Sequence, residues 1–158
     1  MQNNLNRSVK VILDLCFYIG LILEILVPVG LKYAVQLIVK LLGDTTEYAK
    51  ILDHYPYAII SIMLVGASTL AILYELRKMM KTVINDDCFV KQNVTSLYRM
   101  GTYAFVITVL KLLRCFVYFT PAAVIVAGVF LFAGLFSKVL ARVFDTAVRY
   151  KEENDLTI

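Results

Sequence analysis

Residues 101–140, GTYAFVITVLKLLRCFVYFTPAAVIVAGVFLFAGLFSKVL, contain two long apolar runs placed back to back. The runs cover residues 101–119 and 122–140, and they meet at Thr120 and Pro121. A helix needs about 20 predominantly apolar residues to cross a hydrocarbon core about 30 Å thick. The stretch therefore predicts two adjacent membrane-spanning helices joined by a tight connection.

Two further apolar runs, residues 9–27 and 56–76, precede this pair. Hydrophobic residues make up 60% of the chain and its mean hydropathy is +0.76, whereas soluble domains are about half apolar. Pro28 permits a bend after the first run, because proline removes a backbone donor and crowds the preceding turn. We predict an all-α, polytopic integral membrane protein in which residues 1–158 form one four-helix domain.

Glycines in the predicted spans offer places where two helices can approach closely. Gly66 lies among small residues of the second span, and Gly128 and Gly134 lie in the fourth. Lipid is as apolar as leucine, so helices in a membrane associate largely through tight packing at small residues. We expect other helices to pack against these positions.

Basic residues gather on one side of the predicted spans. They occur before the first span, between the second and third, and after the fourth, and cytoplasmic loops typically carry such an excess. In the segment between the first and second spans, by contrast, lysines are balanced by acidic residues. Both termini are therefore expected in the cytoplasm. The basic residues on that side are Arg7, Lys10, Arg77, Lys78, Lys81, Lys91, Arg99, Lys138, Arg142, Arg149 and Lys151.

Three charged residues fall deep within the predicted spans, at comparable depths: Glu24 in the first, and Lys111 and Arg114 in the third. A charge at the bilayer centre costs about 2.5–3.5 kcal/mol on insertion scales, so it usually has a partner. We expect Glu24 to pair with Arg114 or Lys111, either to fix which helices are neighbours or as part of a proton or ion path. Asp14 and Glu75 lie near the inner boundary, within reach of water or a nearby lysine.

The sequence offers no basis for catalysis or for a cofactor. Its one histidine, His54, lies in the predicted outer loop, and Cys16, Cys88 and Cys115 lack the spacing of a metal site. There is no glycine-rich phosphate loop. The net charge of +4 fits the basic loops of a membrane protein better than nucleic-acid binding. We expect no enzyme activity, no cofactor, no metal and no direct contact with nucleic acid.

Two segments outside the predicted spans are amphipathic. In residues 84–100, Val90, Val94 and Leu97 share one face of a short predicted helix. In residues 141–158 polar positions recur every three or four residues, so the fourth helix is expected to continue into the cytoplasm with an apolar face that still needs burial. That face includes Val143, Phe144 and Val148.

Both segments carry a resemblance to a known family. Phe89, Asn93, Val94 and Leu97 follow the second span, and the chain ends in KEENDLTI, residues 151–158. In these features, and in its four spans, the chain resembles the small bacterial membrane proteins grouped as domain of unknown function 2975, the YoaS-like family. Members are often encoded beside a small helix-turn-helix protein. The resemblance implies a bacterial cytoplasmic membrane protein that anchors or antagonises a DNA-binding partner, and it implies no biochemical activity.

Two functional hypotheses follow. The first is a regulatory membrane protein that binds or sequesters a helix-turn-helix transcription regulator through the end of its fourth helix and its tail. The alternative is a small transporter, channel or immunity-type protein that uses its intramembrane charges, and association into a homo-oligomer is compatible with both. The residues expected to bind the partner are Val143, Phe144, Val148, Asn154, Asp155, Leu156, Thr157 and Ile158.

Overall fold

The computed structural model describes residues 2–42, 52, 54–85, 87–117, 119 and 121–155. These residues form four long helices: α1 (Gln2–Leu42), α3 (Tyr55–Ile84), α4 (Lys91–Val117) and α5 (Pro121–Asp155). Each helix contains a stretch that is long and apolar enough to cross a membrane. The prediction of an all-helical chain with four candidate membrane spans is therefore confirmed.

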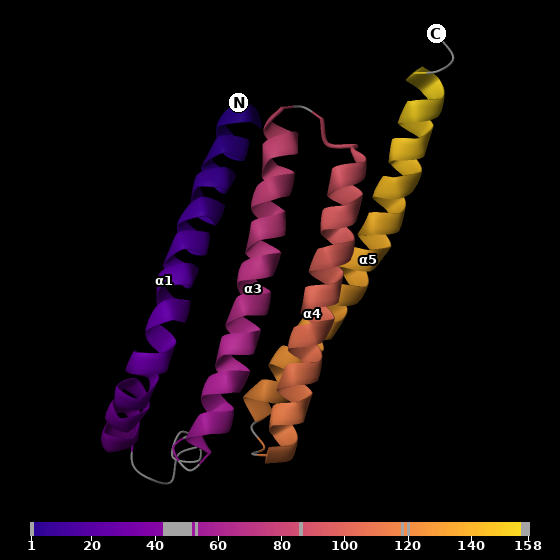
Figure 1. Cartoon of the computed structure of the whole chain (residues 1–158). Coiled ribbons are helices and arrows are strands. Elements are labelled where there is room, and N and C mark those ends of the chain that lie inside the picture. Colours follow the sequence, from indigo (N-terminus) through magenta and orange to yellow (C-terminus); the bar gives the residue numbers. More distant parts are fainter. Residues whose placement is uncertain are drawn as a thin grey trace.

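The helices are arranged in a row that follows their order in the sequence. Figure 1 shows α1, α3 and α4 side by side, with α5 crossing behind α4. Within the described residues, α1 contacts α3, α3 contacts α4 and α4 contacts α5, and no other pair of helices is in contact. α1 begins and α5 ends at the same end of the row, where α3 also connects to α4 (Figure 1). We call this the terminal end.

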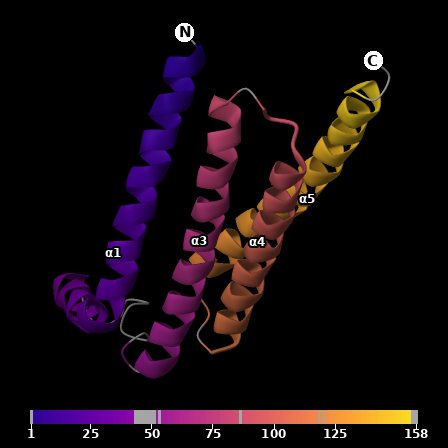
Figure 2. The same cartoon turned by 45° about the horizontal axis from the view of Figure 1, so that its top comes forward.

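α1 continues as one helix through Pro28, and it bends. Figures 1 and 2 show its last part turned away from the direction of its first part, as the proline predicts. Beyond the bend, Val35 packs against Ala58 of α3, with partly buried leucine and valine side chains around them. This small apolar cluster joins α1 to α3 at the end of the row opposite the terminal end.

Helices α3 and α4 extend further than the apolar runs that predicted them. α3 reaches Ile84, and α4 is continuous from Lys91 to Val117. The amphipathic segment predicted at residues 84–100 is thus mostly the first part of α4 and not a separate short helix. The reason is that no proline interrupts residues 91–117 and that Gly101, in their interior, is held by packing against α5.

The seam between α4 and α5 is built on small residues. A Cβ atom added to Gly101 would lie 3.0 Å from the carbonyl oxygen of Gly134, and one added to Gly134 would lie 3.1 Å from that of Gly101. The two backbones therefore approach each other closely, as small residues allow. Gly134 packs as predicted, whereas Gly128 has open space around it. Buried alanines line the same two helices: Ala104, Ala123, Ala127 and Ala141.

Candidate functional site

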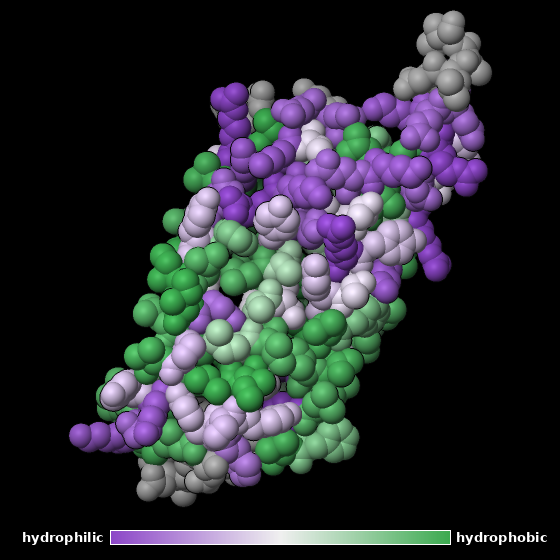
Figure 3. Space-filling view, in the orientation of Figure 1, coloured by the Kyte–Doolittle hydropathy of each residue, from purple (hydrophilic) through white to green (hydrophobic). Residues whose placement is uncertain are grey.

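Polar side chains concentrate at the terminal end of the row. Figure 3 shows hydrophilic residues over this end and a broad hydrophobic zone next to it. Several of these polar residues lie between the last turns of α3 and the first turns of α4, where their side chains form hydrogen bonds with one another. We call this group the polar junction; its members are Glu75, Thr82, Asn93, Ser96 and Arg99.

Glu75 is the buried charge of the polar junction. Only 3% of the residue is exposed, and its carboxylate accepts hydrogen bonds from Ser96 Oγ at 2.6 Å and from an Arg99 guanidinium nitrogen at 3.2 Å. Burying a carboxylate is costly unless it is paired and hydrogen-bonded. Two residues of α4, rather than the nearby lysine expected from the sequence, therefore hold this carboxylate and tie α3 to α4.

Asn93 fixes the connection between the same two helices. It is 1% exposed, and its Nδ2 donates to Thr82 Oγ1 at 2.7 Å and to the carbonyl of Cys88 at 2.8 Å. One amide thus links the end of α3, the connecting segment and the start of α4. Its neighbours Val94 and Leu97 are also buried, while Phe89 is exposed. Of the four residues that carry the family resemblance after the second span, three are thus packed inside the molecule.

The apolar face predicted on the last turns of α5 is partly covered by the chain itself. The ring of Phe144 lies 5.4 Å from that of Phe89, and Val148 is buried, whereas Val143 is exposed. Lys151 Nζ donates a hydrogen bond to Asp87 Oδ1 at 2.8 Å, which also links α5 to the segment between α3 and α4. Of the predicted tail, Asn154 is exposed. The side chain of Asp155 and residues Leu156, Thr157 and Ile158 lie outside the described residues.

The connecting segment and α5 together border a hollow of about 220 Å³. It is open rather than enclosed, and its rim combines apolar and charged side chains. The residues that line it are Phe89, Val90, Lys91, Val148, Lys151 and Glu152.

Glu24 lies against α3, away from the cations that the sequence matched to it. A Cβ atom added to Gly66 would overlap the Glu24 carboxylate, so Gly66 is the notch that accommodates this side chain. Oε1 of Glu24 is buried and has no hydrogen-bond partner in the described part of the chain. Lys111 and Arg114 lie on α4, which α1 does not contact there. Counting residues along the spans gives the depth of each charge in the membrane. It does not show that α3 lies between α1 and α4.

The described ion pair between α1 and α3 involves other residues. Arg77 of α3 donates to Asp14 of α1, and its guanidinium lies 4.4 Å from the ring centre of Phe17 and 5.0 Å from that of Tyr18. This pair was not among the contacts predicted from the sequence. Asp14 and Arg77 carry opposite charges and both lie within about five residues of the predicted inner boundary, and that signal could have found the pair.

These features define a class of protein: a multi-pass α-helical membrane protein whose polar residues concentrate at one end. The family model described as "Protein of unknown function (DUF2975)" matches residues 40–158, and the chain belongs to this family. No curated protein and no solved structure matches the chain. The matched part takes in α3, α4 and α5, and leaves all but the last residues of α1 outside.

Proposed function

We propose that the protein is a membrane-anchored regulator that binds and sequesters a small helix-turn-helix transcription regulator. In this proposal the terminal end faces the cytoplasm of a bacterial cell, as the basic residues near it favour. The partner, not this chain, contacts DNA. The observation that carries the proposal is an exposed stripe along the last turns of α5.

The length of α5 supports this placement. α5 has 35 residues, whereas a membrane span needs about 20. If its apolar first part spans the bilayer, its last turns extend beyond it. Figure 1 shows these turns reaching past the ends of α3 and α4. They are therefore well placed to meet a cytoplasmic protein.

The exposed stripe has the composition of a binding surface. Val143, Thr146, Tyr150 and Glu153 follow one another at intervals of three and four residues, so they share one side of α5. We call them the α5 outer stripe. Val143 is 58% exposed and Tyr150 is 64% exposed. Thr146, Tyr150 and Glu153 also border a groove of about 120 Å³ together with Arg149. Aromatic anchors within a polar surround are typical of protein interfaces.

The charge of the tail favours a basic partner. Glu152, Glu153 and Asp155 outnumber Lys151 at the end of the chain. DNA-binding proteins commonly carry a basic surface. Charge complementarity of this kind mainly speeds encounter and selects partners. Phe144, whose ring packs against that of Phe89, and the buried Val148 would support the stripe from behind rather than touch the partner.

The test is recovery of the partner from native membranes. Full-length protein tagged at its N-terminus is purified in mild detergent, and bound proteins are identified by mass spectrometry. We expect the wild type to retain a helix-turn-helix protein. The double variant Val143→Ser/Tyr150→Ala and a chain lacking residues 154–158 should lose it. The matched control is Tyr33→Ala, an exposed tyrosine on the last part of α1. Equal recovery from all four proteins, or recovery of no DNA-binding protein, would contradict the proposal.

One observation favours the alternative of a transporter or channel. The buried Glu24 oxygen without a partner is the kind of intramembrane group that proton and ion pathways use. In liposomes with an imposed proton or cation gradient, this function requires a flux in the wild type that Glu24→Gln abolishes. A flux that is absent from both proteins would exclude it.

A further inference from the structure

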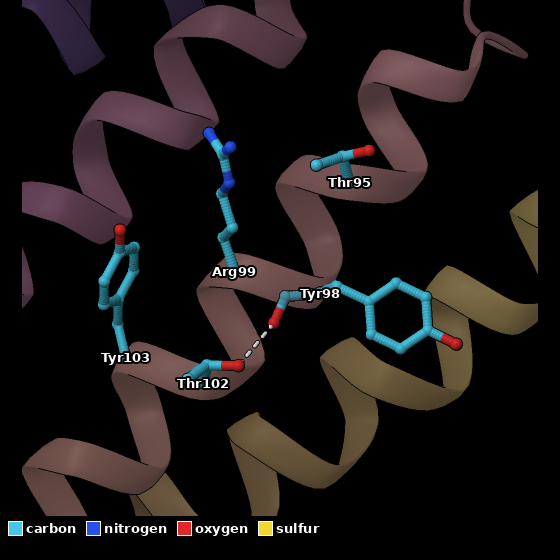
Figure 4. Close-up of a pocket in the computed structure, with 5 residues that line it drawn as sticks. All are labelled: Thr95, Tyr98, Arg99, Thr102 and Tyr103. Atoms are coloured by element: carbon cyan, nitrogen blue, oxygen red, sulfur yellow. Dashed lines mark hydrogen bonds between the residues drawn. The ribbon is translucent and has the colours of Figure 1, made fainter.

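We propose that the outward face of α4 beside the polar junction binds the phosphate of an anionic phospholipid headgroup. Figure 4 shows the five residues of this face, which border a hollow of about 210 Å³. Their spacing of three and four residues places them along one stripe of the helix. The residues are Thr95, Tyr98, Arg99, Thr102 and Tyr103. This proposal is independent of the regulatory function proposed above.

Arg99 is the group that would hold the phosphate. Its side chain is 54% exposed, and in the described structure it makes one ion pair, the 3.2 Å contact with Glu75. A guanidinium has five N–H donors in a planar fork that matches phosphate oxygens. Glu75 receives its shorter hydrogen bond from Ser96, at 2.6 Å. The contact with Glu75 therefore orients the guanidinium and leaves other N–H groups for a ligand.

Tyr103 completes the polar part of the site. It follows Arg99 by one helical turn, and Figure 4 shows both side chains extending toward α3, whereas Tyr98 extends toward α5. A phosphate between Arg99 and Tyr103 can accept from the guanidinium and from the phenol. The hydroxyls of Thr95 and Thr102 donate instead to the carbonyls of Lys91, at 3.1 Å, and Tyr98, at 3.0 Å.

The residues that follow on α4 indicate a lipid rather than a soluble phosphate. Val106, Val109 and Leu113 continue the stripe of Arg99 and Thr102 at the same spacing, and all three are exposed. If the phosphate of a phospholipid binds at Arg99, the acyl chains of the same lipid can lie along these exposed apolar residues. Tyrosine and arginine also favour the level where hydrocarbon meets water, because each combines an apolar body with a polar tip.

Native mass spectrometry of the full-length protein tests the site. The protein is equilibrated in mixed micelles with phosphatidylglycerol or phosphatidylcholine, and the retained lipid is counted. We expect wild type to prefer phosphatidylglycerol, and Arg99→Gln to reduce that preference roughly ten-fold, equivalent to about 1.4 kcal/mol. Tyr103→Phe should give a smaller loss. The control Arg142→Gln, at an exposed position on α5, should keep the preference.

A further variant keeps the test valid if Arg99→Gln destabilises the fold. Glu75→Gln can still accept from Ser96 but no longer neutralises Arg99, so it should retain more phosphatidylglycerol than wild type. Millimolar inorganic phosphate should not displace the lipid. Displacement by phosphate would assign the site to a soluble anion and overturn the proposal. An unchanged preference in Arg99→Gln, an equal loss in Arg142→Gln, or no gain in Glu75→Gln would also overturn it.

Discussion

α5 and α1 are attached to the rest of the molecule in different ways. α5 meets α4 backbone to backbone at Gly101 and Gly134. In the strongly hydrophobic 18-residue stretch of α5, 22% of the residues are buried. In the strongly hydrophobic 18-residue stretch of α1, no residue is buried. Its described polar links to α3 include the Asp14–Arg77 pair, a 3.5 Å hydrogen bond from the Tyr55 hydroxyl to the Pro28 carbonyl, and the Glu24 side chain at Gly66. The family match also includes α5 and leaves most of α1 outside.

The difference shows two ways of joining helices where lipid removes the usual hydrophobic gain. Close packing of small residues depends on shape along the whole seam, so one added side chain disturbs many contacts. Polar links depend on a few atoms at the ends of flexible side chains, which can move aside. We therefore expect substitutions at the α4–α5 seam to lower the free energy of unfolding more than substitutions at the α1–α3 seam.

The largest effect is expected at the α4–α5 seam, for Gly101→Leu. Its Cβ would lie 3.0 Å from the Gly134 carbonyl oxygen, and the backbones would have to separate. The free energy of unfolding in detergent should fall by about 1–3 kcal/mol, the usual cost of overpacking. The matched control is Gly128→Leu, since nothing lies within 4 Å of an added Cβ there. Equal losses in both variants would show that helix contact is not the cause.

A smaller effect is expected at the notch between α1 and α3, for Gly66→Ala. The new methyl group overlaps the Glu24 carboxylate, but that group can rotate away. The cost should be about 0.5–1.5 kcal/mol, the range for a side chain forced from its preferred rotamer. In a Glu24→Ala background the same substitution should cost nothing, which a double-mutant cycle of unfolding free energies measures. Additive changes in the free energy of unfolding would show that the Glu24 side chain does not contact position 66.

The smallest effect is expected for the Asp14–Arg77 pair. Both side chains are partly exposed, and such pairs contribute about 0.2–1 kcal/mol. The coupling energy between Asp14→Asn and Arg77→Gln should fall in this range and decrease with added salt. A coupling larger than the loss in Gly101→Leu would reverse the ranking of the two seams.

The sequence predicted the helices and the bend better than their ends. Apolar runs are sufficient to place four spans, and Pro28 is sufficient to place a bend in α1. Hydropathy falls at the membrane boundary, however, whereas helical hydrogen bonding continues into polar sequence. For that reason the ends of α3 at Ile84 and α4 at Lys91 could not be read from apolar runs alone.

Contacts between side chains were predicted less well, for a physical reason. Residue counting gives the depth of Glu24 in a span, but it does not give the order of helices in the row or the direction in which a side chain points. Asn93 was accessible to sequence reasoning, since it lies three residues after Val90 and four before Leu97, on their apolar side. An amide at such a position is expected to be buried and to need partners.

The row arrangement has a consequence for how the chain is made. Among the helices that the structure describes, each contacts only the described helices before and after it in the sequence. Each can therefore dock as soon as it leaves the ribosome and enters the bilayer, with no need to wait for a distant segment. Chains dominated by such local contacts assemble quickly, because little loop entropy is lost before contacts form. Synthesis and assembly can thus proceed in step, from α1 to α5.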